Sequence, residues 1–383
     1  MTSPQAPDVS SAASASASAS ASETIGFDAF WDGRRMQGHT VFTVDNGMLH
    51  LVDESRDDAR DRPAIRADHE VGGALMPHLT DHHTHLGLTD PAGLFANGIT
   101  DAVDLGWIPE VASTWLADHP GHPAVRIAGA LITAPGGYPT NAGWAPPGSA
   151  AEVENAVEAT DAVRKQVMLG ASRIKVALNT DAGPSVDNST LIAIVEEAHD
   201  AGVPVTVHAQ GIGQVVRSVN AGADQLAHAP FSERLDDDLL RRAADAGMSW
   251  VSTLDIHGWG RPTPEFATAV DNVRRFASAG GRIHYGTDLG NGPLPVGVNE
   301  GELSALATAG LNDEQLLRAI AGEVGRTGAC VSVGPRFAWI PTLPPERQDL
   351  GITVRNLAAP SALPAWLATA RGHTTTTILG ART

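Results

Sequence analysis

The pattern of hydrophobic and polar positions divides the chain into a central region of alternating strand-like and helical segments and two strand-like flanks. Eight short apolar or β-branched runs follow one another in the central region, with helical patterns between them. The runs are 74–86, 99–105, 125–132, 172–178, 203–209, 223–229, 248–254 and 282–289. Eight such units in series predict an α/β fold, a (β/α)8 barrel of the TIM type, with a doubly wound open sheet as the alternative. No Gly-x-Gly-x-x-Gly opens the first turn after a strand, which argues against a dinucleotide-binding open sheet.

Two of the helical patterns indicate which side chains pack against the strands. The first has one apolar face made of Val153, Ala156, Val157, Thr160, Val163 and Val167. The second has one made of Leu191, Ile194, Val195 and Ala198. Residues three or four apart share a helix face, so each set predicts the buried side of a helix.

The two flanks differ from the central region in composition and periodicity. Residues 1–23 form a Ser/Ala-rich tail with no apolar face to bury, which predicts disorder. Residues 41–44 and 48–52 read as a hairpin with an Asn46-Gly47 turn, and the Pro-rich stretch 325–383 is again strand-like. We expect residues 24–72 and 325–383 to form one small β-sandwich-like domain, with the barrel, residues 73–324, inserted between them.

Composition narrows the classes of partner. The chain has a formal net charge of −18, which disfavours nucleic acid and anionic membranes as partners and leaves a small-molecule substrate. The single cysteine, Cys330, excludes an intrachain disulfide and cysteine-rich zinc sites. No apolar run spans a bilayer and no secretory signal is seen, so a cytoplasmic location is expected. A homo-oligomer is compatible with these data.

Histidine, lysine and aspartate side chains fall at or near the ends of the predicted strands. The set is His83, His85, Lys175, His208, His228 and Asp288. Residues i and i+2 of an extended segment point to the same side, so His83 and His85 can present two imidazoles to one ion. The carboxyl ends of barrel strands converge on one face, and imidazole with carboxylate suits zinc, manganese, iron or nickel. The sequence therefore predicts a metal centre there.

Lys175 is unusual in this chain. Only two of the 26 cationic residues are lysines, Lys165 and Lys175, and the rest are arginines. An ammonium cannot bind a cation, so Lys175 at a metal centre must be neutral or modified, whereas in a metal-free site it would be a buried ion pair. Reaction of the amine with carbon dioxide gives a carbamate, an anion whose two oxygens can bridge two metals.

These residues resemble the motif of the amidohydrolase superfamily. The match is Asp81-x-His83-x-His85 followed in order by Lys175, His208, His228 and Asp288, and the resemblance covers about residues 40–325. Stretches at 98–106, 136–138, 170–176, 197–203 and 220–223 resemble the imidazolonepropionase-like and Xaa-Pro dipeptidase-like branch. Tyr138 stands where that branch often has histidine, and residues 334–340 replace its usual Gly-Lys-x-Ala-Asp-Leu strand.

The resemblance implies a binuclear centre and a hydrolytic mechanism. One metal would take His83, His85 and Asp288, and the other His208 and His228, with zinc the first expectation. The carbamate on Lys175 and a hydroxide would bridge the two metals. The hydroxide would attack the carbonyl of an amide, dipeptide or cyclic amide, and Asp288, the catalytic residue, would carry the proton to the leaving nitrogen.

Specificity should come from the loops that follow the strands. Tyr138, His257 and Arg261 are candidates for contacts with a carboxylate or ring of the substrate, the alternative being ordinary surface loops. Other reactions stay open on the same scaffold, namely deamination of a heterocycle and hydrolysis of a lactone, as does a non-catalytic role. Many deaminases of the superfamily lack the strand-four lysine, so Lys175 favours cleavage of a C–N bond in an amide.

Overall fold

The structure is a computed structural model that describes residues 23–52, 66–322, 326–327, 330–345 and 361–380. The tail at residues 1–22, and with it nearly all of the predicted disordered segment, lies outside the described residues. Within the described part of the chain, no helix combines the length and apolar character needed to cross a bilayer.

Two sheets of purely parallel strands make up the central region, and each of the eight predicted runs contains a strand of one of them. The three-stranded sheet has the order β10 (Ala124–Ile127), β9 (Asp101–Asp104), β8 (Thr80–Thr84). The seven-stranded sheet has the order β12 (Ala150–Glu152), β11 (Leu131–Thr133), β13 (Ile174–Asn179), β14 (Val205–Gln210), β15 (Gln225–Leu226), β16 (Ser249–Val251), β17 (Arg282–His284). The predicted α/β class with a parallel sheet is confirmed.

The two parallel sheets approach each other at both ends, although their ladders do not close into one sheet. Strands β10 and β11 lie in one predicted run and are separated only by residues 128–130. At the other end, β8 bonds to the segment that follows β17. The amide of His85 donates to the carbonyl of Leu289 at 2.8 Å, and the amide of Asp288 donates to the carbonyl of His83 at 2.8 Å. These bonds place the end of the last predicted strand beside the first.

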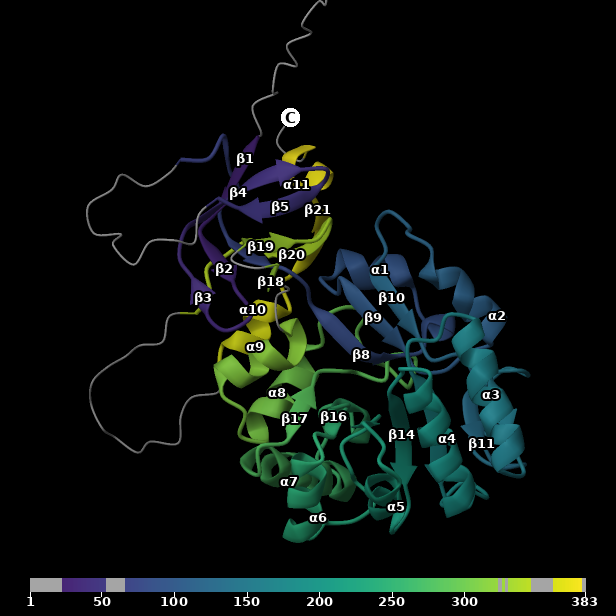
Figure 1. Cartoon of the computed structure of the whole chain (residues 1–383). Helices are drawn as coiled ribbons and strands as arrows, with labels where there is room; N and C mark the ends of the chain where they lie inside the picture. The colour runs from purple at the N-terminus through teal and green to yellow at the C-terminus, as the bar shows by residue number, and fades with distance from the viewer. Residues whose placement is uncertain (1–22, 53–65, 323–325, 328–329, 346–360, 381–383) are drawn as a thin grey trace, which may run out of the picture.

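Helices cover the outer side of these strands (Figure 1). They are α1 (Pro91–Ala96), α2 (Pro109–Ala112), α3 (Ala156–Met168), α4 (Asn188–Asp200), α5 (Gln214–Ala221), α6 (Asp237–Asp245), α7 (Pro264–Ser278), α8 (Glu300–Thr308) and α9 (Asp313–Ala321). The buried face predicted for α4 is confirmed in full, since Leu191, Ile194, Val195 and Ala198 are all buried.

The face predicted for α3 is only partly right. The helix buries Ala159, Val163 and Gln166, whereas Val157 is 73% exposed. Gln166 was not predicted to face inward, because a polar side chain carries no hydrophobic signal. It is buried because its amide oxygen accepts the backbone N–H of Ala130 at 3.0 Å, which satisfies a donor between β10 and β11.

The flanking segments form two further sheets that mix strands from both ends of the chain. The six-stranded sheet has the order β18 (Arg326–Thr327), β19 (Cys330–Val333), β5 (Met48–Leu51), β4 (Thr40–Asp45), β1 (Thr24–Phe27), β6 (His69–Glu70). The five-stranded sheet has the order β21 (Arg371–Thr374), β20 (Arg336–Ile340), β7 (Ala74–Met76), β2 (Ala29–Trp31), β3 (Met36–Gln37). Figure 1 shows these purple and yellow segments side by side, with α11 (Thr375–Gly380) against them and α10 (Leu363–Leu367) nearer α8 and α9.

Local details of these sheets follow from the sequence. Strands β4 and β5 form the predicted hairpin, and its turn residues Asn46 and Gly47 have φ values of 49° and 79°. Edge-on contacts of Phe27 with Phe42 and Phe337 join β1, β4 and β20. The predicted run 74–86 is divided, however: β7 pairs with β2 and β20 in the five-stranded sheet, and only β8 joins the parallel strands.

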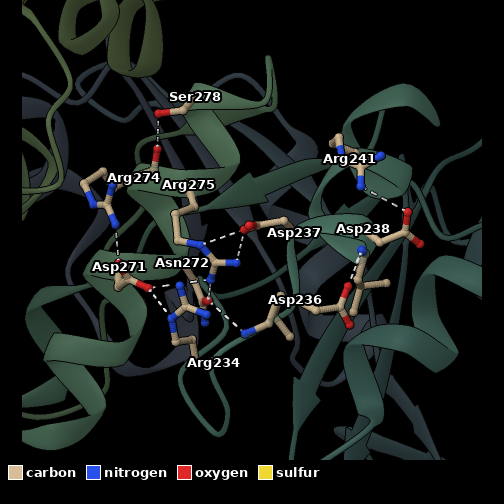
Figure 2. Close-up of polar contacts among 12 residues, drawn as sticks. Arg234, Asp236, Asp237, Asp238, Arg241, Asp271, Asn272, Arg274, Arg275 and Ser278 are labelled. Carbon is tan, nitrogen blue, oxygen red and sulfur yellow. Dashed lines mark hydrogen bonds and ion pairs between the residues drawn. The ribbon is translucent and has the colours of Figure 1, made fainter.

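A polar network fixes α7 to α6 and to the loop before it (Figure 2). Asn272 is fully buried; its amide donates to the carbonyls of Pro230 and Glu233 and its oxygen accepts the N–H of Leu235. Next to it, the guanidinium of Arg275 contacts the carboxylates of Asp237 and Asp271. This network positions the segment that follows His228.

Candidate metal centre

Three of the predicted ligands come together where β8 ends and the chain leaves β17. His83 Nε2 lies 3.0 Å, and His85 Nε2 3.1 Å, from Asp288 Oδ1. One ligand atom from each of the three residues lies within 4.8 Å of the others, and all three side chains are buried. Asp288 reaches this place with a φ of 58°, a left-handed conformation that non-glycine residues rarely adopt.

The outer hydrogen bonds of the two imidazoles settle their tautomers. His83 Nδ1 lies 2.8 Å from the carbonyl of Ala227, and His85 Nδ1 lies 3.1 Å from the carbonyl of Gly106. A carbonyl only accepts, so each Nδ1 carries the hydrogen and each Nε2 carries a lone pair. Both lone pairs therefore face the carboxylate of Asp288, which is also an acceptor. Such an arrangement requires a cation or a proton between them, and the donor set fits a divalent metal.

The electrostatics of this group agree with that requirement. Burial lowers the pKa of His83 to about 4, which keeps its imidazole neutral. Burial also lowers the pKa of His85, but the hydrogen bond and charge of Asp288 raise it more, so the net direction is upward. For Asp288, burial raises the pKa, while His83 and His85 together bring it well below its usual range. The carboxylate therefore stays ionised and attracts positive charge.

His208 and His228 complete a group of four packed imidazoles. The ring centroid of His228 lies 4.7 Å from those of both His83 and His208. Thr253 Oγ1 lies 2.9 Å from His228 Nδ1, and Gln210 Oε1 lies 3.1 Å from His208 Nε2. Burial lowers the pKa of His208 to about 3 and that of His228 well below its usual value. Both rings are therefore neutral, which is the form that binds metal.

Lys175 lies within this group on β13. Its side chain is almost fully buried and interacts electrostatically with the four histidines, His83, His85, His208 and His228. Burial lowers the pKa of its amine to about 7, although Asp288 and Asp104 oppose that shift. Part of the amine is thus neutral near physiological pH. The structure brings all six predicted residues to one place.

Two buried carboxylates support the site and were not assigned a role from the sequence. Asp81 accepts bonds from Thr287 Oγ1 at 2.6 Å and from the amide of His83 at 3.0 Å. Asp104 accepts the amide of Leu86 at 2.9 Å. Burial raises the pKa of Asp81 to about 7 and that of Asp104 to about 6. The available signal was position, because Asp81 opens the His-x-His segment and Asp104 ends the second strand.

Aromatic side chains from the loop after β11 lie against the histidines. Tyr138 stacks on His208 with centroids 4.9 Å apart and planes 21° apart, and Trp144 lies 4.9 Å from His85. The two aromatic rings are 6.3 Å from each other. Tyr138, predicted as a substrate contact, therefore lies beside the metal-ligand candidates, and Trp144 makes the site partly apolar.

The two other predicted substrate contacts occupy different positions. His257 packs on Phe231 with centroids 4.3 Å apart, interacts electrostatically with Asp288, and has a buried Nε2 without a hydrogen-bond partner among the described residues. Arg261 is exposed on the same loop. The structure thus brings His257 toward the site, and a substrate contact by Arg261 stays a prediction.

The chain has sequence relatives of low identity. No protein-family model matches the chain. Uncharacterized proteins of Mycobacterium bovis and Mycobacterium tuberculosis are 25% identical over 287 residues, covering 67% of this chain and 74% of theirs.

Solved structures give closer agreement in shape than in sequence. An Xaa-Pro dipeptidase with bound methionine matches with a TM-score of 0.62 at 20% identity, over 79% of this chain and 87% of that one. Ochratoxinase of A. niger matches with a TM-score of 0.64 at 19% identity, over 78% of this chain and 82% of that one. A putative prolidase from Bifidobacterium longum matches with a TM-score of 0.61 at 22% identity, over 78% of this chain and 81% of that one. The chain therefore shares the fold of these solved structures.

Proposed function

We propose that this protein is a metal-dependent hydrolase that cleaves a C–N bond in an amide, a dipeptide or a cyclic amide. One observation carries the proposal: four buried imidazoles, one ionised carboxylate and one buried lysine come together near the ends of the parallel strands. Imidazole nitrogens and a carboxylate are typical metal ligands. Burying the same groups in an apolar core without such a partner would be unfavourable.

The scaffold that we propose for this site is a single eight-stranded barrel. The continuity of β10 with β11 and the bonds between β8 and residues 285–289 support closure of the two parallel sheets. The two flanking sheets would then be a separate small β domain built from both ends of the chain. Because β7 pairs with β2 and β20, the boundary of this domain would then lie between β7 and β8 instead of at residue 73.

Two divalent cations, with zinc the first expectation, fit the residues in two groups. His83, His85 and Asp288 would hold one, and His208 and His228 the other. Bound cations would supply Lewis acidity, which polarises a carbonyl and lowers the pKa of water. The lowered pKa of Lys175 would give a free amine that can add to carbon dioxide with loss of a proton, and the resulting carbamate would supply oxygen ligands.

The chain's own residues would bind the substrate and move the proton. Asp288 has its second oxygen, Oδ2, bonded to Asn291 Nδ2 at 2.9 Å, which fixes the plane of the carboxylate. Held so, it can take a proton from the attacking water and return it to the leaving nitrogen. Tyr138 and Trp144 would provide an apolar wall. The Nε2 of His257, which has no hydrogen-bond partner among the described residues, would donate to or accept from a polar group of the substrate.

The names of similar structures support cleavage of C–N bonds over other hydrolyses. They include an Xaa-Pro dipeptidase, a prolidase complexed with N-methylphosphonate-L-proline, and an amidohydrolase of bottromycin. Each name describes that protein, and sequence identity to this chain is 17–20%.

The test is a screen of metal-loaded protein against dipeptides, N-acyl amino acids, cyclic amides, aminated heterocycles and lactones. We expect release of an amine from an amide or peptide, and its loss in the His83→Asn variant. The His199→Asn variant is the matched control, because His199 lies outside the site and contacts Asp224. Turnover confined to heterocycles or lactones would assign deamination or lactone hydrolysis in place of the proposed reaction. Turnover unaffected by His83→Asn would contradict the proposed metal centre.

A further inference from the structure

An exposed tryptophan lies beside the candidate metal centre, on the loop that follows β16. The indole of Trp259 is 48% exposed and packs against Gly292. A Cβ atom on Gly292 would lie only 2.6 Å from Cζ2 and 2.7 Å from Nε1 of that indole, so the ring fits there because Gly292 has no side chain. Gly292 follows Asn291, whose side-chain amide bonds to Asp288 Oδ2 at 2.9 Å. The indole therefore adjoins the segment that orients Asp288.

The backbone around Trp259 is shaped to hold the indole in this position. Trp259 has a φ of 50°, a left-handed conformation that a bulky residue rarely adopts, and its neighbours Gly258 and Gly260 also have positive φ values. Its amide donates to the carbonyl of Asp255 at 2.7 Å. A strained backbone persists where the surrounding structure or a function requires it. Folding gains little from an indole that stays half exposed, so a use in binding explains the strain better than packing does.

A second exposed apolar side chain adjoins the same centre from the turn after β8. Leu88 is 41% exposed and lies against Gly290, where an added Cβ would be 3.0 Å from Leu88 Cβ and 3.3 Å from His85 Cβ. Leu88 and His85 thus pack on one glycine, which closely follows Asp288 in the sequence. The ring centroid of Trp144 lies 4.9 Å from that of His85. Apolar side chains from three loops, those after β8, β11 and β16, therefore adjoin the metal-ligand candidates.

Their position distinguishes these apolar groups from ordinary exposed ones. Val157 and Met168 are also exposed, but they lie on α3, at the outer side of the strands. Single exposed apolar side chains of that kind are common and need no explanation. Trp259, Leu88 and Trp144 instead lie beside the groups that would hold a metal and the reacting amide. Ligand sites typically combine such apolar walls with a few polar groups, because burial of the wall against a ligand stabilises the complex.

We propose that Trp259 and Leu88 determine specificity, and that they select amides with a bulky apolar group, aliphatic or aromatic, beside the scissile C–N bond. This inference rests on the proposed hydrolase function, which brings the amide to the metal centre. The apolar group of the substrate would cover the exposed faces of the indole and of the leucine side chain. Each methylene that it buries should strengthen binding about fourfold. A short or charged group would leave both faces in water and would lose that contribution.

The selectivity of the metal-loaded protein tests the inference. Two substrate pairs are compared, leucylleucine with glycylglycine and N-hexanoylglycine with N-acetylglycine. We expect kcat/KM for the apolar member of a pair to exceed that for the small one by about 100-fold or more. Trp259→Ala should reduce this ratio about tenfold or more, and Trp259→Phe should retain most of it, because a phenyl ring restores the apolar contact. Met168→Ala is the matched control, since Met168 is exposed and apolar but lies on α3, and it should keep the ratio of the wild type.

Binding of a probe that has no amide separates this inference from the proposed function. Naphthylmethanol is titrated into the metal-loaded protein, and calorimetry gives its Kd. We expect Trp259→Ala to raise that Kd about tenfold or more, Leu88→Ala to raise it less, and Met168→Ala to leave it unchanged. Such binding without hydrolysis of any amide would contradict the proposed function and support the apolar site alone. Equal kcat/KM within both substrate pairs, or a Kd that Trp259→Ala does not change, would overturn the inference.

Discussion

His83 and Asp288 face each other with atoms that both accept hydrogen bonds: Nε2 of His83 lies 3.0 Å from Oδ1 of Asp288. The N–H at Nδ1 of His83 donates to the carbonyl of Ala227. Two acceptors at that distance repel each other unless positive charge lies between them. Metal binding should therefore relieve a repulsion that is built into the folded chain.

The first prediction concerns metal content and its coupling to stability. We expect about two divalent ions per chain and a clear fall in Tm when they are removed by a chelator. His83→Asn should weaken metal binding by more than about 100-fold, because even the loss of a group that only supports a ligand costs up to that much. Elemental analysis and calorimetry measure both effects, and His199→Asn should behave like the wild type.

Lys175 should be chemically distinct from Lys165. Intact-mass measurement under gentle conditions should show the addition of one carbon dioxide, which Lys175→Arg abolishes. That variant should also lose about 10²-fold or more in turnover, since a guanidinium brings a permanent charge into the ligand group. Lys165→Arg is the control, because Lys165 is exposed beside Glu110. An unmodified amine in fully active protein would rule out the carbamate.

Asp288→Asn tests proton transfer separately from metal binding. The amide keeps the size of the carboxylate but cannot take up a proton, so turnover should fall roughly 10²-fold or more. Metal analysis of the same variant distinguishes a lost base from a lost ligand. Turnover near that of the wild type with metal retained would remove Asp288 from the proposed role.

Glu302 should make stability depend on pH. It is fully buried, it accepts the amide of Asp255 at 2.8 Å, and burial raises the pKa of its carboxyl to about 7. A raised folded-state pKa gives stability that is complete below the unfolded value of 4.5 and is lost as pH rises through about 7. The wild type should lose up to about 3 kcal/mol from this group between roughly pH 5 and pH 8.

The matched variants for this effect are Glu302→Gln and Glu300→Gln. Glutamine does not ionise, so Glu302→Gln should flatten the decline of Tm with rising pH. Glu300 is exposed, and its replacement should leave the slope unchanged. Identical slopes in all three proteins would show that Glu302 does not titrate in this range.

Asn272 and Arg241, both drawn in Figure 2, should differ greatly in their contribution to stability. Asn272→Ala removes the side-chain partner of two carbonyls and one amide, which should cost about 2–4 kcal/mol and lower the Tm by several degrees. Arg241→Gln removes an exposed ion pair with Asp238 and should change the free energy of unfolding by less than about 1 kcal/mol. Thermal and denaturant unfolding of the two variants provide the comparison.

The sequence by itself determined the series of parallel strands, the β4–β5 hairpin and the six residues of the candidate metal centre. Hydrophobic periodicity and turn residues act over a few positions, so each strand and the hairpin turn could be predicted from a short stretch of sequence. The ligand candidates could be recognised in the sequence because the carboxyl ends of parallel strands meet at one face of the fold.

Only the tertiary structure decided which acceptors hold the histidines, why Gln166 faces inward, and where β7 pairs. The carbonyls of Ala227 and Gly106, the amide of Ala130 and the strands β2 and β20 all come from distant parts of the chain. A hydrogen bond or a charge interaction depends on distance in space, and one-dimensional spacing does not contain that distance.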